Sequence, residues 1–300
     1  MKIPSEEKFI ISADIGGSHI TVAVIDLLNK TILKDTRTRR PVNAQDSADR
    51  ILSAWSDAIK AVLTVFPEKI MRLALAMPGP FNYETGVSFI KGLHKYELLY
   101  GINVKEGLAS LLKLEPENIR FRNDAEALVH GEVMAGSGQD CSRLIGFTLG
   151  TGMGSAVSMA GVTTDANWGS ECFGSSIADD YFSTRWFLKA YSLLAGVSCN
   201  NVKDLAELAD VDSNASSVFL SFARSFAAFI TDKVVSHQPQ KVLIGGNIAK
   251  SKHLFLNELQ IQLAPYIDPN FVVTDLLGED AALIGAAFTF EHNLHNQSKS

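Results

Sequence analysis

A strand, a glycine-rich turn and a second strand occur twice in this chain of 300 residues, half a chain apart. The first copy spans residues 9–25 and the second spans residues 144–159, so that Gly17 and Gly152 lie 135 residues apart. Each copy is followed by alternating helical and strand patterns, which are typical of an α/β domain. Because such a repeat indicates duplication of a structural unit, we expect two α/β domains with a cleft between them.

The remaining patterns give the other elements of both halves. Apolar residues at helical spacing, such as Ile51, Trp55 and Ile59, predict helices, and short β-rich runs that stop at Gly, Pro or Asn predict strands. No Gly/Ser-rich or Pro-rich linker divides the halves, so we expect residues 1–123 and a C-terminal helix in 279–300 to form one domain, and residues 124–278 the other. The expected helices are 45–66, 104–112, 177–194, 216–236 and 279–292, and the expected strands are 31–37, 72–77, 119–121 and 241–244.

Composition argues against several classes of function. The formal net charge of -6 gives no excess of positive charge that would indicate binding to nucleic acid, and it argues against binding to anionic membranes. No run approaches the roughly 18 apolar residues of a membrane span, and the first ten residues do not resemble a secretion signal. Cys141, Cys172 and Cys199 are odd in number and too far apart for a disulfide framework or a metal knuckle, so we expect reduced thiols in a cytoplasmic protein.

The glycine turns are candidate phosphate-binding sites. Backbone N–H groups of such turns point into the enclosed space, and the missing Cβ atoms let a phosphate approach closely. Glycine in one hairpin usually serves the turn itself, but two turns at matched places are more informative. A third glycine pair ends a strand where a helix is expected to begin, so it serves either phosphate binding or helix–strand packing. The candidate residues are Gly16, Gly17, Ser18, Gly150, Thr151, Gly152, Gly154, Gly245, Gly246 and Asn247.

Asp14 ends an apolar strand immediately before the first glycine turn. A carboxylate there is either a turn residue or, beside the phosphates of a nucleotide, a partner of hydrated Mg²⁺, which prefers carboxylates, waters and phosphate oxygens. The chain lacks the GxxxxGK[ST] pattern, so the P-loop mechanism does not apply. We therefore expect Asp14 to hold Mg²⁺, through water, at a phosphate site of another kind.

Six segments occur in order along nearly the whole chain: residues 14–19, 77–80, 123–127, 149–154, 244–248 and 283–287. They resemble motifs of the ROK family (repressors, open reading frames and kinases). The resemblance implies the actin-like, ribonuclease H-like ATPase fold, with ATP and a small-molecule sugar as ligands. It also implies transfer of the ATP γ-phosphate to a hexose, often at the 6-hydroxyl, and a homodimer. In the same order, the family patterns are DIGGT, PGP, NDAN, LGTGIG, GGG and LGAA.

The same resemblance assigns roles to residues of the first half. It implies that Asp124 is the general base that takes the proton from the acceptor hydroxyl, that Asn123 hydrogen-bonds the sugar, and that Gly79 lets the sugar lie against the backbone. Phosphoryl transfer needs a group that orients and deprotonates the nucleophile, and a carboxylate suits that task. Taken alone, Asn-Asp before an apolar run is an ordinary helix N-cap.

The acceptor region departs from the family pattern, which has GExGH, a zinc knuckle CxCGxxGC and a Glu four residues before a Ser. Glu171 stands for the first Glu, but Gly174 replaces the His. Asp179, four residues before Ser183, replaces the second Glu with a shorter carboxylate. We expect both carboxylates to bind the sugar, the alternatives being an exposed loop residue for Glu171 and a helix N-terminal charge for Asp179. Because the knuckle is missing, we expect no structural zinc.

Two other functions are alternatives to a sugar kinase. A sugar-responsive repressor of this family needs an N-terminal DNA-binding module, yet the first strand begins near Phe9, so we do not expect one. The altered acceptor motif favours a catalytically weak sugar- or nucleotide-binding protein on a kinase scaffold, whereas Asp14, Asp124 and both glycine turns speak against it. We expect His94 on a surface loop, and His130 on the surface or in the packing of a helix. The sequence does not identify the sugar.

Overall fold

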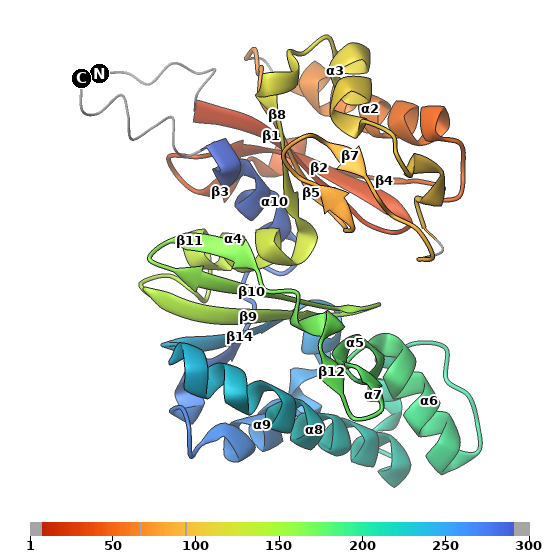
Figure 1. Cartoon of the computed structure of the whole chain (residues 1–300), viewed down its shortest axis with the longest axis vertical. Coiled ribbons are helices and arrows are strands. Elements are labelled where there is room, and N and C mark those ends of the chain that lie inside the picture. Colours follow the sequence, from red (N-terminus) through yellow and green to blue (C-terminus); the bar gives the residue numbers. More distant parts are fainter. Residues whose placement is uncertain (1–7, 67, 94, 291–300) are drawn as a thin grey trace. The chain divides into compact units, whose positions relative to one another are not determined.

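The computed structural model describes residues 8–66, 68–93 and 95–290. It divides the chain into two compact units (Figure 1). The first unit takes the chain up to Ala135 and from Glu279 onward, and the second unit comprises Gly136–Gly278. The chain therefore leaves the first unit once and returns to it near its C-terminal end.

The first unit is built around a six-stranded sheet. Two of its strands, β1 and β2, form an antiparallel hairpin across the first glycine turn, whereas β1, β5 and β8 run parallel. A further strand, β4 (Thr38–Pro41), pairs with β2. In sheet order the strands are β3 (Thr31–Ile32), β2 (His19–Asp26), β1 (Phe9–Ile15), β5 (Leu73–Met77) and β8 (Ile119–Asn123).

The two faces of this sheet carry different helices. Ile11 and Ala13 join the apolar core that includes buried residues of α2 (Ala48–Val65) and α3 (Val104–Leu112). Side chains alternate along a strand, and Ser12 faces the other way, since its Oγ donates to Leu283 O of α10 at 2.7 Å. Asp14, two residues further along β1, therefore lies on the α10 face of the sheet.

Two helices pack closely on that face: α4 (Asp124–Ala135) and α10 (Asp280–Ala287). A Cβ on Gly131 of α4 would collide with backbone atoms of Ala281, and a Cβ on Gly285 of α10 would collide with the backbone of Ala127. This close packing keeps α4 with the first unit, so the boundary lies after Ala135 rather than at residue 123, where the sequence predicted it.

The second unit repeats the arrangement with a five-stranded sheet. Strands β9 and β10 form an antiparallel hairpin across the second glycine turn, and β14 runs parallel to β9 as β5 does to β1. The duplicated α/β fold expected from the repeat is therefore confirmed. In sheet order the strands are β11 (Val162–Asp165), β10 (Met153–Met159), β9 (Arg143–Leu149), β14 (Lys241–Gly245) and β15 (Val272–Thr274).

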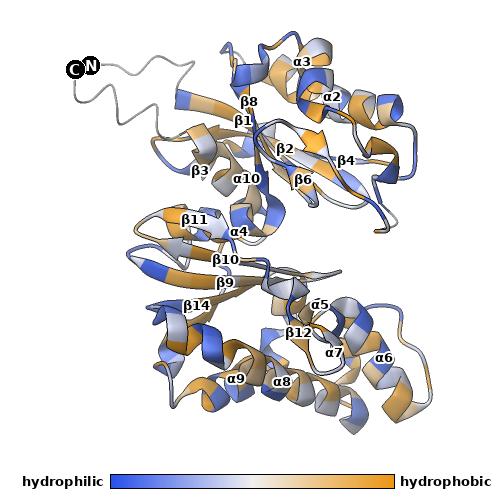
Figure 2. Ribbon diagram, viewed as in Figure 1, coloured by the Kyte–Doolittle hydropathy of each residue, from blue (hydrophilic) through white to orange (hydrophobic). Residues whose placement is uncertain are grey.

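Helices with one apolar side cover this second sheet. Phe222 and Phe226 of α8 stack with their ring centroids 5.5 Å apart, and Phe226 lies 5.2 Å from Phe147 of β9. Figure 2 shows hydrophobic and hydrophilic residues alternating along α6, α8 and α9, as expected of helices that bury one side. The helices are α5 (Ala178–Tyr181), α6 (Thr184–Ala195), α7 (Val202–Leu208), α8 (Ser213–His237) and α9 (Leu256–Leu263).

Two expected elements are interrupted. The strand expected over 31–37 stops after β3, because Thr36 Oγ1 accepts from Val24 N at 2.9 Å and donates to Leu33 O at 2.6 Å, which closes a 3-10 turn. The helix expected over 177–194 is divided into α5 and α6 by Phe182, which is fully buried among aromatic rings. In both places a tertiary contact overrides the local pattern.

The last expected helix is shorter than its sequence pattern. Helix α10 ends at Ala287 and is followed by a 3-10 turn over Phe288–Phe290. The expected end at residue 292, like the rest of the predicted segment up to residue 300, lies outside the described residues. The described part of α10 is almost wholly buried, as its apolar sequence predicts.

Candidate functional site

Three parallel strands of the first unit end at one edge of its sheet, and the predicted residues follow them. Asp14 is the penultimate residue of β1 and lies opposite Ala76 of β5. Met77 ends β5 and lies opposite Asn123, which ends β8. Ligands of α/β sheets bind beyond the carboxyl ends of parallel strands. The register therefore gathers Asp14, the turn after Met77 and the 123–124 pair at the kind of edge where such sites form.

Tyr83 connects Gly79 to Asn123 at this edge. Its hydroxyl accepts a hydrogen bond from Asn123 Nδ2 at 3.0 Å and donates one to Met77 O at 3.2 Å. A Cβ on Gly79 would lie 3.1 Å from Tyr83 Oη and 4.0 Å from Asn123 Nδ2, so the Gly79 backbone faces this polar pair. Sequence reasoning missed Tyr83, because no spacing relates residues 83 and 123.

Asn123 and Asp124 form the junction between β8 and α4. Asn123 Oδ1 accepts from Ala125 N at 2.9 Å and from Glu126 N at 3.1 Å, and Asp124 Oδ1 accepts from Ala125 N at 2.8 Å. The ordinary N-cap role is thus present. These bonds fix the start of α4 and the orientation of the Asp124 carboxylate.

Asp14 is surrounded by charged groups. Burial raises its pKa from 3.8 to about 7, and the negative charges of Asp124 and Glu279 add to this rise. The positive charges of Arg39 and Arg37 oppose it. Because the negative charges of Asp124 and Glu279 act on Asp14, a divalent cation at Asp14 would relieve the repulsion, and a single carboxylate fits the predicted role in holding hydrated Mg²⁺ through water.

The first glycine turn is held by two aromatic side chains. Gly16 N donates to His19 O at 2.9 Å, and Gly16 O accepts from Tyr96 Oη at 2.6 Å. Burial raises the pKa of Tyr96 to about 12, so its hydroxyl stays protonated and donates this bond. A Cβ on Gly16 would lie 2.9 Å from His19 Cε1, because the imidazole lies against the turn. Gly17 and Ser18, at the tip of the turn, are exposed.

The second glycine turn is held by the start of α6 and by a carboxylate. Gly150 N donates to Gly152 O at 2.9 Å, and Gly150 O accepts from Thr184 N at 2.8 Å and Thr184 Oγ1 at 2.9 Å. Met153 N donates to Asp179 Oδ1 at 2.6 Å. A Cβ on Gly152 would lie 2.7 Å from that same oxygen. A larger residue at 152 would therefore displace the Asp179 carboxylate from Met153 N.

The two carboxylates expected to bind sugar both form ion pairs. Asp179 Oδ2 lies 2.7 Å from Arg185 Nη2, while its other oxygen holds Met153 N. Glu171 is exposed and pairs with Lys233 of α8. Asp179 thus positions the second turn, a role that no spacing in the sequence signals.

The third glycine pair has a packing role. Gly246 follows β14 with a φ of +90°, and a Cβ there would lie 2.6 Å from Leu149 O. Its N–H donates to Asp275 Oδ2 at 3.4 Å. Asn247 precedes a 3-10 segment, Ile248–Leu254, rather than the expected α-helix. Close approach to Leu149 and a positive φ explain the glycine at 246, and phosphate binding at this place stays a prediction.

The structure describes one of the two histidines that lie outside the motifs. His130 is buried in α4, with its ring centroid 6.2 Å from that of Phe288. Burial, with the charge of Arg122 adding to it, lowers the pKa of His130 to about 3, so this imidazole is a neutral packing group. His94 lies outside the described residues.

A small hairpin occupies the acceptor region where the family pattern has its knuckle. It consists of β12 (Cys172–Phe173) and β13 (Ser176–Ile177), and the Phe173 ring lies 5.1 Å from Phe182 and 5.5 Å from Phe229. Within the described ranges, no group of three or more His, Cys, Asp or Glu side chains could hold a metal ion. Aromatic packing therefore anchors this hairpin.

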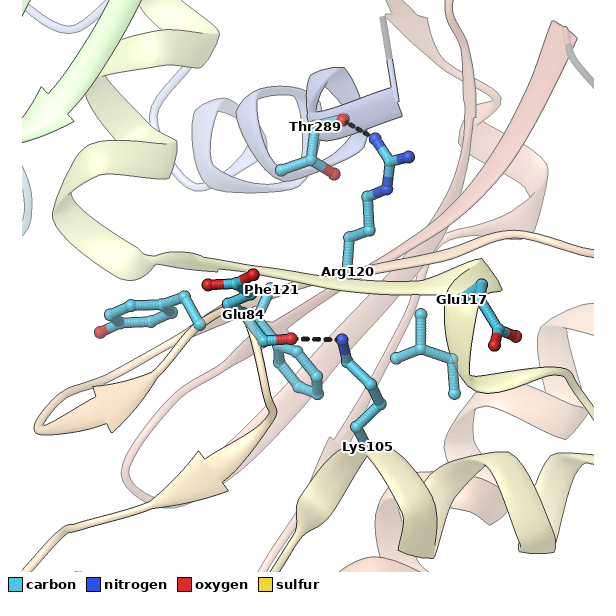
Figure 3. Close-up of a pocket in the computed structure, with 8 residues that line it drawn as sticks. Glu84, Lys105, Glu117, Arg120, Phe121 and Thr289 are labelled. Carbon is cyan, nitrogen blue, oxygen red and sulfur yellow. Dashed lines mark hydrogen bonds between the residues drawn. The ribbon is translucent and has the colours of Figure 1, made fainter. Parts of the chain in front are cut away.

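A hollow of about 250 Å³ lies along β8, the edge strand of the first unit (Figure 3). Its lining includes Tyr83, but otherwise differs from the predicted site residues. Its two basic side chains bond to backbone carbonyls, since Arg120 donates to Thr289 O and Lys105 donates to Glu84 O. The hollow is thus distinct from the carboxyl edge that carries Asp14 and Asp124.

Comparison with known proteins gives consistent matches over nearly the whole chain. The sequence model of the ROK family matches residues 10–171 and 172–293. Among characterised relatives, a glucokinase of Thermotoga maritima is 25% identical, with 93% of this chain and 96% of that protein covered. An N-acetylmannosamine kinase of Haemophilus influenzae is 22% identical, with 93% and 94% covered. A ROK family glucokinase from Streptomyces griseus, solved with glucose and AMPPNP, has a TM-score of 0.76 at 20% identity, covering 95% of this chain and 99% of its own.

Proposed function

Because the chain belongs to the ROK family, we propose that it is an ATP-dependent sugar kinase that transfers the γ-phosphate of ATP to a hexose hydroxyl, most simply the 6-hydroxyl. The observation that carries this proposal is the shared carboxyl edge of β1, β5 and β8, where Asp14 and Asp124 follow parallel strands beside a glycine turn. The fold and the names of the relatives, which include kinases of glucose and N-acetylmannosamine, support it.

In the proposed reaction Asp124 is the general base. It accepts the proton of the acceptor hydroxyl while the sugar oxygen forms a bond to the γ-phosphorus. The bond from that phosphorus to the β–γ bridging oxygen breaks, and ADP leaves with the electron pair. Asn123 fixes the start of α4 and thereby the orientation of Asp124.

Asp14 is the residue that would hold Mg²⁺, through water. When bound, this ion would neutralise charge on the phosphates. The glycine turns around Gly17 and Gly152 would offer backbone N–H groups to phosphate oxygens, with Ser18, Thr151 and Gly154 in the same turns. In this proposal Gly245, Gly246 and Asn247 contact the nucleotide at the end of β14.

The sugar contacts are proposed for residues of both units. Gly79 and Asn123 would meet the sugar in the first unit, and Glu171 and Asp179 in the second. A carboxylate oxygen can accept a second hydrogen bond, so the bonds that Asp179 already receives from Met153 N and Arg185 leave acceptor capacity for a hydroxyl. Because an imidazole is absent at Gly174 and Asp179 is short, we expect a preference that differs from a strict glucokinase.

A catalytically weak sugar- or nucleotide-binding protein is the second candidate. The ion pairs of Glu171 with Lys233 and of Asp179 with Arg185 favour it, because both carboxylates already have cationic partners. The two candidates differ in turnover. A binding protein would bind ATP or sugar without releasing ADP at an appreciable rate.

An ADP-release assay over a panel of sugars tests the proposal. The panel contains glucose, mannose, galactose, N-acetylglucosamine, N-acetylmannosamine and a β-glucoside, each with and without Mg²⁺. We expect Mg²⁺-dependent ADP release with at least one sugar, and nuclear magnetic resonance of the product then identifies the phosphorylated hydroxyl. Sugar binding without turnover on any member of the panel would favour the second candidate.

The remaining expectations concern partners and location. Among the described residues, none of the helices combines the length and the apolarity needed to cross a membrane. We propose that the protein acts in the cytoplasm as a homodimer and does not bind nucleic acid. Light scattering and a DNA-binding titration test the last two points directly.

A further inference from the structure

Arg39 belongs to the same row of residues as Asp14. Asp14 lies opposite Thr21 of β2, and Thr21 lies opposite Arg39 of β4. Residues directly opposite one another in neighbouring strands share a face of the sheet. Arg39 and Asp14 therefore lie on the face covered by α10, and the positive charge of Arg39 acts on the Asp14 carboxylate.

The guanidinium of Arg39 is held on two sides at the first glycine turn. Its Nη1 lies 3.1 Å from Glu279 Oε2, and its Nη2 lies 3.3 Å from His19 Nδ1. Burial, with the charge of Arg39 adding to it, lowers the pKa of His19, so that Nδ1 of the neutral ring can accept this bond. Since the same imidazole lies against Gly16, Arg39 is fixed beside the turn.

These ion pairs explain little of the stability of the fold. The side chains of Arg39 and Glu279 are 47% and 43% exposed, and exposed pairs contribute little to stability. Glu279 Oε2 also lies 3.3 Å from Arg37 Nη2, and Arg37 Nε lies 3.2 Å from Asp280 Oδ1. Arg37 can therefore remain ion-paired with Glu279 and Asp280 when Arg39 leaves Glu279 to bind another anion.

The chemistry of the proposed reaction supplies such an anion. The planar guanidinium matches the oxygens of a phosphate with two parallel hydrogen bonds, and positive charge is needed where the phosphoryl group is transferred. We propose that Arg39 binds the terminal phosphate of ATP at the first glycine turn, exchanging its bond to Glu279 for bonds to phosphate oxygens. This inference rests on the proposed kinase function.

Three variants test it: Arg39→Gln, Arg39→Lys and Arg40→Gln. Arg40 is the matched control, because it is the next residue of β4 and lies opposite Ile20, on the other face of the sheet. Calorimetry in the presence of Mg²⁺ measures the affinity for AMPPNP and for ADP. We expect Arg39→Gln to weaken AMPPNP binding by about ten- to a hundredfold, with ADP binding little changed. Arg39→Lys should lose less affinity than Arg39→Gln, because lysine keeps the positive charge but lacks the paired N–H donors of the guanidinium.

Each outcome decides a different point. Thermal unfolding first establishes that all three variants are folded. Equal AMPPNP affinities of Arg39→Gln and Arg40→Gln would overturn the inference, while sugar phosphorylation by the wild-type protein would leave the kinase function standing. Equal losses of AMPPNP and ADP affinity would exclude the terminal phosphate as the partner of Arg39. A wild-type protein that binds no nucleotide would overturn both the inference and the proposed function.

Discussion

Asp14 and Asp179 show how single side chains of the two units depend on neighbours that are distant in sequence. Asp14 lies among Asp124 and Glu279, whose charges add to burial in raising its pKa to about 7. Asp179 bonds to Met153 N and to Arg185, and so joins the acceptor region to the second glycine turn. At this scale, each of these carboxylates lies next to a glycine turn or bonds to it, although the motifs assign the carboxylates to separate tasks.

The role of Asp124 is tested by removing its basicity with little change of shape. Asp124→Asn keeps a side-chain oxygen that can still accept from Ala125 N, so the start of α4 should be retained. We expect kcat for sugar phosphorylation to fall by about 10²–10⁴, the usual contribution of a general base. Steady-state kinetics and nucleotide binding are measured on the same folded sample. Turnover near the wild-type rate would remove Asp124 from the proposed mechanism.

The raised pKa of Asp14 predicts a pH-dependent difference in stability. Between the unfolded pKa of 3.8 and the folded pKa of about 7, the folded protein keeps a proton that the unfolded chain has lost. The contribution of this group to stability is therefore complete below the lower pKa and is lost as the pH rises through the higher one. Asp14→Asn cannot ionise, so its stability relative to wild type should increase over this window, by at most about 4 kcal/mol.

Urea unfolding of both proteins, without nucleotide or Mg²⁺, measures this difference across the pH range. The comparison cancels the titration of His130 and other groups that both proteins share. If the free energies of unfolding of the two proteins, plotted against pH, stay parallel from about pH 4 to pH 8, the proposed environment of Asp14 is wrong. Asp14→Asn should also abolish most of the Mg²⁺-dependent activity, because the amide no longer offers a negative charge to the ion.

Glu171 and Asp179 should differ in what their substitution affects. Glu171→Gln should raise KM for the sugar alone, because Glu171 bonds to Lys233 and to no part of the second turn that the structure describes. Asp179→Asn should raise KM for both sugar and ATP, since Asp179 also holds Met153 N. Losing a charged hydrogen bond should lower kcat/KM by roughly ten- to a few hundredfold in each case. An unchanged sugar KM in both variants would remove these residues from the acceptor site.

At the scale of elements, sequence patterns predict what depends on local runs of residues. The two hairpins follow from short apolar strand patterns on either side of a glycine turn, and α3 begins and ends at the residues predicted for it. The hydrogen bonds that shape the site join residues far apart, 40 residues between Tyr83 and Asn123, 80 between Gly16 and Tyr96, and 240 between Arg39 and Glu279. No local periodicity encodes such contacts, which is why these partners were not predicted.

Alanine should have opposite effects on stability at two helical glycines: Gly131 in the contact of α4 with α10, and Gly107 in α3. Gly131→Ala would place a methyl group against the backbone of Ala281, which cannot rotate away, so we expect a loss of about 1–3 kcal/mol in stability. Gly107→Ala in α3 would meet only the side chain of Leu52, whose Cδ1 end can move, and alanine favours the helix by about 1 kcal/mol. Chemical denaturation measures both. A Gly131→Ala protein as stable as the Gly107→Ala protein would show that the two helices can separate at little cost.

At the scale of the whole molecule, duplication gives each unit an antiparallel hairpin with a glycine turn and a parallel strand beside it. The units differ in the elements that come after the hairpin. Both add two parallel strands, but those of the first end at Met77 and at Asn123, which precedes Asp124, whereas the second has the β12–β13 hairpin before its strands β14 and β15. Both units have an apolar core of their own.

That difference leads to a prediction about metals for the intact protein. Rings of Phe173, Tyr181, Phe182 and Phe229 pack against one another where the family pattern has a zinc knuckle, with Phe173 and Tyr181 centroids 5.2 Å apart. We therefore expect tag-free protein to contain no stoichiometric zinc, and a chelator to leave its unfolding temperature unchanged while stopping activity until Mg²⁺ is restored. Phe173→Ala should lower the unfolding temperature, because the partly buried ring of Phe173 would lose its contacts with Phe182 and Phe229. One tightly held zinc ion per chain, or a chelator that lowers the unfolding temperature as much as Phe173→Ala does, would show that metal rather than aromatic packing supports this region.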